Sequence, residues 1–262
     1  MDIIVCLKQV PDTNEVRINH ETGTLIREGV PSIINPDDKN GLEEALRIRD
    51  EKGGKVTVLC MGPPQAKEAL REAIAMGADK GILLSDRAFA GSDTWATATI
   101  LAAGIRAIGK FDIIFCGRQA IDGDTAQVGP EIAEFLDIPQ ISYAEKVEII
   151  EDKVRVKRKL EDGHFIIESK LPVLITSIKE LNTPRYPRVK RIFEVFKNEA
   201  LIEEWTINNI EVDTTQIGVK NSPTNVYKSF VPKKEFNGIK IEGSPKETAA
   251  KLVEELKKIH IV

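Results

Sequence analysis

The chain has 262 residues, of which 42% are hydrophobic and 30% charged, and its formal net charge is −4. This is the composition of an ordinary globular protein, and the small negative charge argues against nucleic acid or an anionic membrane surface as partners. No run of about 20 clean apolar residues occurs, so we expect no membrane insertion. The N-terminus lacks the basic region and cleavage site of a signal peptide.

Residues 1–139 predict alternating strands and helices. Apolar runs too continuous for a sheet face in water predict buried strands at residues 3–10, 55–62, 80–86 and 111–117. Helical segments with caps or terminating glycines follow at residues 39–52, 65–77, 92–109 and 130–136. Before the first helix we expect an excursion or small hairpin with a turn at Glu21-Thr22-Gly23. This order favours an α/β fold with a doubly wound, mostly parallel sheet of the Rossmann-like type.

The chain changes character after Pro139. Residues 141–178 alternate strand-like runs with turns, which predicts added β structure whose last run returns to the main sheet. Residues 181–227 mix charges with prolines and show no clear period, so we expect a long irregular arm packed on another subunit. An amphipathic helix capped by Ser244 closes the chain. The expected regions are a nucleotide-binding domain at 1–180, an arm at 181–235 and a C-terminal helix region at 236–262.

The cysteines and histidines give no sign of a nucleophile or a metal site. Cys6, Cys60 and Cys116 are odd in number, far apart and set in apolar runs, so we expect buried free thiols, which fit a reducing cytoplasm. No histidine lies near a cysteine or a serine motif. The motifs GxSxG, HExxH, CxxC and GxxxxGKS/T do not occur, and the absence of GxGxxG counts against an ordinary dinucleotide dehydrogenase.

Polar and small residues gather after the predicted strands, at the edge where open parallel sheets bind ligands. These segments are residues 10–12, 61–63, 92–97 and 117–128, and a fifth, 35–38, precedes the first long helix. Glycines let a backbone approach a ligand closely, and free N–H groups at helix starts attract phosphate. Each feature alone is more often a cap or a turn. Together they favour an adenine-nucleotide site.

Several strings along the chain resemble the beta subunit of electron-transfer flavoprotein. In order they are CLKQVPD, INPDDKNGLEEA, MGPPQAKEALREAIAMGADKGILL, GRQAIDGDTAQVGPEIAEFL and LNTPRYPRVKRI. The resemblance covers the whole chain and departs from the family near residues 161–164, where relatives commonly have a second glycine followed by an acid. It implies a Rossmann-like domain of the adenine-nucleotide hydrolase type, paired with an alpha subunit that carries FAD.

The resemblance also implies a cofactor site. In the respiratory branch of the family this site holds AMP, and in the branch found in anaerobes it holds a second FAD. The helix start GSDTWATA and the loop DGDTAQVG, which is less acidic than in AMP-holding relatives, favour the second branch. A pyrophosphate has more oxygens to satisfy than one phosphate, and a further helix start with hydroxyls would satisfy them. The matching positions are Cys6, Asn35, Pro36, Asp37, Asp38, Met61, Asp93, Thr94, Thr97, Gly117, Arg118, Gln119, Ala120, Ile121, Asp122, Gly123, Asp124, Thr125, Ala126, Gln127 and Val128.

This branch implies flavin-based electron bifurcation. NADH would deliver a hydride to the FAD, and the electrons would divide between ferredoxin or flavodoxin and the alpha-subunit FAD, which feeds a flavin dehydrogenase of the acyl-CoA or lactate type. The flavin carries the chemistry, so we expect no catalytic side chain and no metal. The segment LNTPRYPRVKRIF resembles the family's partner-docking segment, with Arg185, Tyr186 and an apolar anchor at Val189. A plain solvated loop is the alternative.

Three other functions stay open. The first is a simple electron carrier whose beta subunit holds structural AMP. The second is an enzyme that hydrolyses or transfers an adenylyl group, although such enzymes usually resemble a Ser-Gly-Gly-x-Asp-Ser loop after the first strand, where this chain reads KQVPDTNE. The third is a scaffold without a nucleotide, against which the five converging segments argue.

Overall fold

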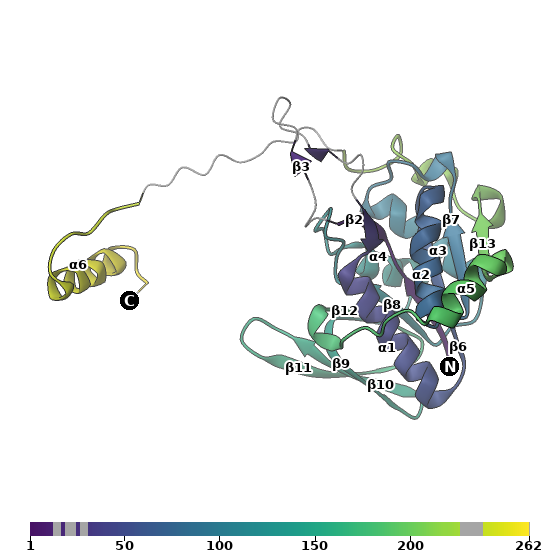
Figure 1. Ribbon diagram of the computed structural model, residues 1–262, viewed down its shortest axis with the longest axis horizontal. Helices are drawn as coiled ribbons and strands as arrows, with labels where there is room; N and C mark the ends of the chain where they lie inside the picture. Colours follow the sequence, from purple (N-terminus) through teal and green to yellow (C-terminus); the bar gives the residue numbers. More distant parts are fainter. Residues whose placement is uncertain (13–16, 19–24, 27–30, 226–237, 262) are drawn as a thin grey trace. The chain divides into compact units, whose positions relative to one another are not determined.

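The computed structural model describes residues 1–12, 17–18, 25–26, 31–225 and 238–261 (Figure 1). The chain forms two compact units, Met1–Tyr227 and Lys228–Val262. Residues 181–225, which we expected to form a separate arm, therefore belong to the same unit as the predicted nucleotide-binding domain. Within the described ranges no helix combines the length and the hydrophobicity needed to cross a bilayer.

The first unit is built on a nine-stranded sheet in the order β11-β10-β9-β12-β8-β1-β6-β7-β13 (Figure 1). Neighbouring strands from β9 to β13 pair in parallel, and β10 and β11 extend the sheet with antiparallel pairs. The central strands are buried apolar runs, as a sheet covered on both faces requires. The predicted doubly wound, mostly parallel α/β fold is confirmed. The strands are β1 (Asp2–Cys6), β6 (Lys55–Met61), β7 (Lys80–Leu84), β8 (Ile113–Gly117), β9 (Gln140–Ile150), β10 (Lys153–Lys159), β11 (His164–Lys170), β12 (Val173–Ser177) and β13 (Ile202–Trp205).

Helices cover both faces of this sheet. Side chains of α1 and α2 share one core cluster with Val5 and Phe115, and side chains of α3 and α4 share a second cluster with Ile4 and Ile114. Adjacent residues of one strand thus belong to opposite cores, because strand side chains alternate between the faces. The helices of this layer are α1 (Pro36–Lys52), α2 (Lys67–Met76), α3 (Thr94–Ile108) and α4 (Val128–Leu136).

The strand predicted at residues 3–10 is divided between two strands in the structure. β1 ends at Cys6, and β2 (Gln9–Pro11) pairs antiparallel with β5 (Ser32–Ile34) in a separate small sheet. β3 (Arg17–Ile18) and β4 (Leu25–Ile26) form the predicted small hairpin, whose expected turn at residues 21–23 lies outside the described residues. The early end of β1 brings Leu7 and Lys8, rather than residues 10–12, to the carboxyl edge of the sheet.

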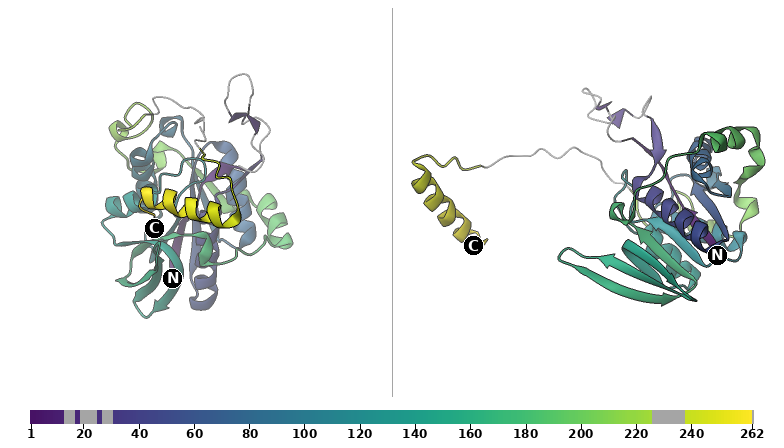
Figure 2. Two further views of the ribbon diagram at one scale, coloured as in Figure 1. Left: turned by 90° about the vertical axis from the view of Figure 1, so that its left-hand side faces the viewer. Right: turned by 60° about the horizontal axis from the view of Figure 1, so that its bottom comes forward.

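The added β structure is present as predicted. β9, β10 and β11 form an antiparallel set that extends beyond the helices (Figure 2), and β12 returns to the main sheet between β9 and β8. β11 is the outer edge of the sheet. Phe165 and Ile166 on this strand are each 57% exposed.

The prediction of an irregular segment at residues 181–227 is wrong for residues 189–197 and 202–205, which form a helix and a strand, whereas residues 182–188 and 206–225 contain neither α-helix nor β-strand. Helix α5 (Val189–Lys197) packs against α2, and β13 pairs in parallel with β7. Val189, expected among charges on an exposed irregular segment, is the first residue of α5. Val195 is the buried residue of this helix, and its other apolar side chains face outward. The apolar residues from Val189 to Phe196 repeat at the spacing of an amphipathic helix, so the sequence carried a helix signal that the prediction overlooked.

The second unit contains α6 (Pro245–Lys258). Ser244 and Glu247 form a capping box at its start, and Pro245 occupies the first turn, so the predicted cap is confirmed.

Candidate functional site

A cleft of about 390 Å³ opens at the carboxyl ends of β1, β6 and β8, beside the first turns of α3 and α4. Its size is within the usual range for small-ligand sites. Most of the predicted cofactor positions line it: Cys6, Asp38, Met61, Asp93, Thr94, Thr97, Gly117, Arg118, Gln119, Ala120, Gly123, Thr125, Ala126, Gln127 and Val128. The predicted positions that do not line it are Asn35, Pro36, Asp37, Ile121, Asp122 and Asp124. Ser92, from the predicted segment 92–97, also lines it, and the lining residues that the sequence did not predict are Leu7, Lys8, Leu101, Cys116 and Gly129.

Asp38 joins three elements at the floor of the cleft. Its Oδ2 accepts the N–H of Lys8 at 2.7 Å, and its Oδ1 accepts the N–H of Gly117 at 2.9 Å. A Cβ at position 117 would lie 2.1 Å from Asp38 Oδ1, so glycine is required there. Burial raises the pKa of Asp38 to about 7, although its hydrogen bonds act in the opposite direction. The first turn of α1 is thereby tied to the ends of β1 and β8.

Asn35 supports the loop after β8 from behind. Its Nδ2 donates to the carbonyl of Gln119 at 2.8 Å, and its Oδ1 accepts the N–H of Ile121 at 3.1 Å. Asp124 and Ala126 adopt left-handed backbone conformations, with φ of 52° and 54°. The side chain of Gln119 donates to Asp124 Oδ1 at 2.7 Å. Asn35, Ile121 and Asp124 therefore shape the loop without lining the cleft.

The other predicted acids outside the cleft pair with basic side chains. Lys8 Nζ lies 2.7 Å from Asp122 Oδ1, and Arg118 Nε lies 3.4 Å from Asp37 Oδ2. Burial raises the pKa of Asp37, and Arg118 opposes this rise. Lys8 and Arg118 themselves line the cleft. The site thus presents two cations whose acidic partners sit outside it.

Two helix starts meet at the cleft and differ in their caps. The side chain of Asp93 accepts the N–H of Ala96 at 3.0 Å and so caps α3. Gln127, at the start of α4, makes no capping side-chain bond, which leaves the first N–H groups of α4 for an anion. Between the two starts, the hydroxyl of Thr94 lies 3.2 Å from both Gln127 Oε1 and Glu131 Oε1. The start of α4 is therefore the better-prepared phosphate position.

Two of the three thiols, those of Cys60 and Cys116, have raised pKa values, and Cys116 lines the cleft. Cys6, Cys60 and Cys116 are free and buried, as predicted. A hydrogen bond with Cys6 and burial raise the pKa of Cys116, and burial raises the pKa of Cys60 to about 12. Thiols of this kind stay protonated and are poor nucleophiles. Among the residues that the structure describes, no group of three or more His, Cys, Asp and Glu side chains could hold a metal ion.

The three predicted docking residues have different environments. Tyr186 is 91% exposed and Val189 is 70% exposed. The guanidinium of Arg185 instead binds Glu43 and Asp50 within the chain. Phe193, the last residue of the predicted docking segment, and Phe196, which lies beyond it, are 63% and 59% exposed on α5.

The fold and the cleft together define a Rossmann-like α/β protein whose site is equipped to hold a ligand by backbone donors, hydroxyls and cations. A family model described as "Electron transfer flavoprotein domain" matches residues 22–205. The chain is 60% identical to the electron transfer flavoprotein subunit beta of Thermoanaerobacterium thermosaccharolyticum and 58% identical to that of Clostridium acetobutylicum. It is 52% identical to the caffeyl-CoA reductase-Etf complex subunit CarD of Acetobacterium woodii. Each comparison covers 100% of both chains.

The chain belongs to the electron transfer flavoprotein family, and within it to the beta subunits.

Proposed function

We propose that this chain binds FAD in the cleft, pairs with a FAD-carrying alpha subunit, and takes part in flavin-based electron bifurcation in the cytoplasm. The observation that carries the proposal is that the cleft reaches both helix starts, α4 at Gln127 and Val128 and α3 at Thr94 and Thr97. Two neighbouring groups of donors suit a pyrophosphate better than the single phosphate of AMP. The 52% identity to a subunit named for a caffeyl-CoA reductase-Etf complex also supports this branch of the family.

The residues present fit an adenine dinucleotide. The uncapped start of α4 offers backbone N–H groups, and Lys8 and Arg118 supply positive charge at the same cleft. A Cβ at Gly117 or Gly129 would lie within 3.0 Å of a side-chain atom of Asp38 or Thr176, so these glycines let β8 pack against α1 and α4 against β12 at the edge of the cleft. Asp38 keeps the floor in place through its two backbone hydrogen bonds.

FAD held in this cleft would supply the redox chemistry, namely hydride acceptance from NADH and single-electron transfer to ferredoxin or flavodoxin and to the alpha-subunit FAD. The residues of this chain bind and orient it. The buried thiol of Cys6 and the protonated thiol of Cys116 border the cleft, and the apolar side chains of Met61 and Leu101 exclude water from part of its wall.

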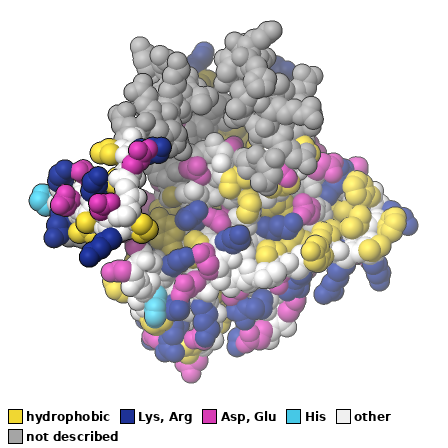
Figure 3. Space-filling model, turned by 60° about the vertical axis from the view of Figure 1, so that its left-hand side comes forward, with side chains coloured by type: hydrophobic (Ala, Val, Ile, Leu, Met, Phe, Trp, Pro, Cys, Tyr) yellow, Lys and Arg dark blue, Asp and Glu magenta, His cyan; other side chains and the backbone are white. Residues whose placement is uncertain are grey.

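The outer face of α5 supports docking of a flavin dehydrogenase. Val189, Phe193 and Phe196 expose an apolar surface, and exposed basic residues flank it. In the space-filling view, hydrophobic side chains likewise gather beside lysines and arginines on one face of the molecule (Figure 3). Exposed apolar patches bordered by polar residues are typical of protein interfaces. The name of the Acetobacterium relative favours a partner that acts on acyl-CoA over one of the lactate type.

The test is the nucleotide content of the purified heterodimer. The chain is co-expressed with its alpha subunit, nucleotides are released with acid, and FAD and AMP are quantified. Two FAD per heterodimer would support the proposal, and reduction by NADH with ferredoxin as acceptor would then test bifurcation. One FAD with one AMP would replace it with the simple electron carrier, and ATP turnover by the chain would favour an adenylyl-transferring enzyme.

A further inference from the structure

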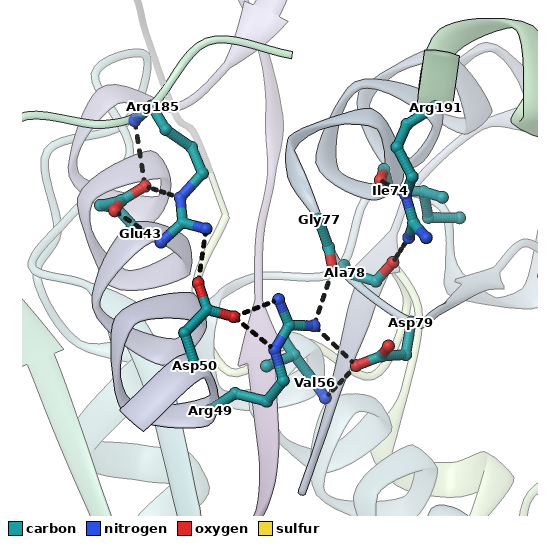
Figure 4. Close-up of polar contacts among 10 residues, drawn as sticks. All are labelled: Glu43, Arg49, Asp50, Val56, Ile74, Gly77, Ala78, Asp79, Arg185 and Arg191. Carbon is teal, nitrogen blue, oxygen red and sulfur yellow. Dashed lines mark hydrogen bonds and ion pairs between the residues drawn. The ribbon is translucent and has the colours of Figure 1, made fainter. Parts of the chain in front are cut away.

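A connected set of ion pairs holds the segment before α5 on the body of the first unit (Figure 4). Arg185 Nε and Nη2 donate to the two carboxylate oxygens of Glu43 at 2.8 and 3.0 Å. Its backbone N–H donates to Glu43 Oε2 at 3.0 Å, and its Nη1 donates to Asp50 Oδ2 at 2.8 Å. Both acids belong to α1. The side chains of Arg185 and Glu43 are 23% and 13% exposed, so water and salt screen this pair only weakly.

A second arginine fixes the other end of the segment. Arg191 Nε donates to the carbonyl of Ile74 at 3.2 Å, and its Nη2 donates to the carbonyl of Ala78. Ile74 lies in the last turn of α2 and Ala78 just beyond it, where the helix dipole favours a cation. The backbone N–H of Arg188 donates to Ala75 at 2.9 Å in the same place.

Arg49 links the two attachments (Figure 4). Its Nε and Nη2 donate to Asp50 Oδ1 at 2.9 and 2.8 Å, and its Nη1 reaches the carbonyl of Gly77 at 2.9 Å and Asp79 Oδ2 at 3.1 Å. The same Asp79 oxygen accepts the N–H of Val56 at 2.8 Å. The ends of α1 and α2 and the segment from Arg185 to Arg191 are therefore held in one hydrogen-bonded unit.

Between the two arginines the chain points outward. Tyr186 is 91% exposed and Val189 is 70% exposed, so packing against the body contributes little to their position. Pro187 restricts the backbone between them. The side chains of Arg185 and Arg191 on either side, the N–H of Arg188 and the packing of α5 on α2 set where these two side chains stand.

We propose that Arg185 and Arg191 are positioning residues that hold Tyr186 and Val189 in place for docking of the flavin dehydrogenase. This rests on the docking surface proposed above. A segment already held in its bound conformation loses less conformational freedom on association, so affinity is higher than for the same side chains on a free loop. Arginine suits this task because its planar fork binds a carboxylate through two parallel hydrogen bonds, which lysine cannot do.

The test uses the complete heterodimer and a flavin dehydrogenase, of the acyl-CoA or lactate type, that exchanges electrons saturably with the wild type. Arg185→Gln should raise the KM for the heterodimer about tenfold, equivalent to about 1.4 kcal/mol, with kcat and FAD content unchanged. Arg185→Lys should recover part of the loss. Hydrogen exchange of residues 183–191 should become faster in both variants. If Arg185→Gln does not fold, Glu43→Gln removes the same pair from the α1 side.

Arg155→Gln is the matched control. Arg155 lies on β10, away from the segment before α5, and its Nε also donates to a carboxylate, Glu168 Oε1, at 2.7 Å. It should leave KM unchanged. Val189→Ser tests the docking surface itself. If Val189→Ser raises KM and Arg185→Gln does not, the positioning role is wrong and the docking surface stands. If neither raises KM, the docking surface is wrong and the inference falls with it.

Discussion

Gly117→Ala should destabilise the chain through a contact at the floor of the cleft. The new Cβ would lie 2.1 Å from Asp38 Oδ1, 2.7 Å from the Asp38 nitrogen and 3.0 Å from the Asp37 carbonyl carbon. Backbone atoms of α1 cannot swing aside, so the helix start must shift from β8. The shift removes the 2.9 Å hydrogen bond from Gly117 to Asp38. Overpacking costs about 1–3 kcal/mol and loss of a hydrogen bond to a charged group about 1.5–3 kcal/mol, which alanine's lower unfolded-state entropy offsets by about 0.4–1 kcal/mol. We expect a net loss of about 3 kcal/mol.

The assay is urea unfolding followed by circular dichroism at pH 8, where Asp38 is ionised. A loss of this size lowers the unfolding midpoint by about 1–3 M urea at typical slopes. Gly123→Ala is the control from the same loop, since nothing lies within 4 Å of its Cβ position and its φ is not in the left-handed region. It should change the free energy of unfolding by less than about 0.5 kcal/mol. Equal stability of the two variants would refute the tight contact between Gly117 and α1.

Three further outcomes follow from the described contacts. Burial raises the pKa of Asp38 from 3.8 to about 7, so the contribution of its protonated carboxyl to the free energy of unfolding is fully present below about pH 4 and is lost as pH rises through 7. Asp38→Asn should remove this pH-dependent part, which amounts to roughly 4 kcal/mol. A variant whose stability varies with pH as the wild type's does would contradict this. Thr94→Val with Thr97→Val should lower FAD occupancy of the beta site and leave alpha-site FAD in place, measured as nucleotide content; unchanged occupancy would show that the α3 start is no phosphate position. Ser244→Ala should weaken the first turn of α6 by about 1 kcal/mol, seen as faster amide exchange near Glu247, whereas unaltered exchange would mean that the capping box contributes nothing.

Strands and helices can be predicted where apolar residues recur with a short period. Contacts between residues that are far apart in the sequence cannot be predicted in this way. The central strands and the edge of the sheet that forms the cleft followed from apolar runs and from the rule that ligands lie beyond the carboxyl ends of parallel strands. The strand boundary at Cys6 was missed because Leu7 and Val10 continue the apolar run, although the backbone leaves the sheet between them. The internal role of Arg185 was missed because its partner, Glu43, lies 142 residues away.

The roles of the acids near the cleft show the same limit. The sequence pattern places Asp37, Asp38 and Asp122 in turns and at helix starts, and it does not distinguish the roles of the three carboxylates. In the structure one ties backbone amides together and the other two pair with Arg118 and Lys8. The conformation of the folded loop determines which carboxylate oxygen accepts a hydrogen bond from which donor. Helix α5 is different, because its apolar residues repeat at helical spacing in the sequence; what the sequence could not show is that most of them face outward.

The outer strand β11 has a practical consequence for work with the isolated chain. Each of its residues is at least partly accessible, and its far side offers backbone amides and carbonyls that β10 does not use. An exposed edge strand can pair with a strand of another chain. The exposed side chains of Phe165 and Ile166 favour this pairing, whereas the charge of Lys170 at the end of the strand opposes it. The chain expressed without an alpha subunit should therefore aggregate increasingly as its concentration rises, and Ile166→Lys should suppress this aggregation.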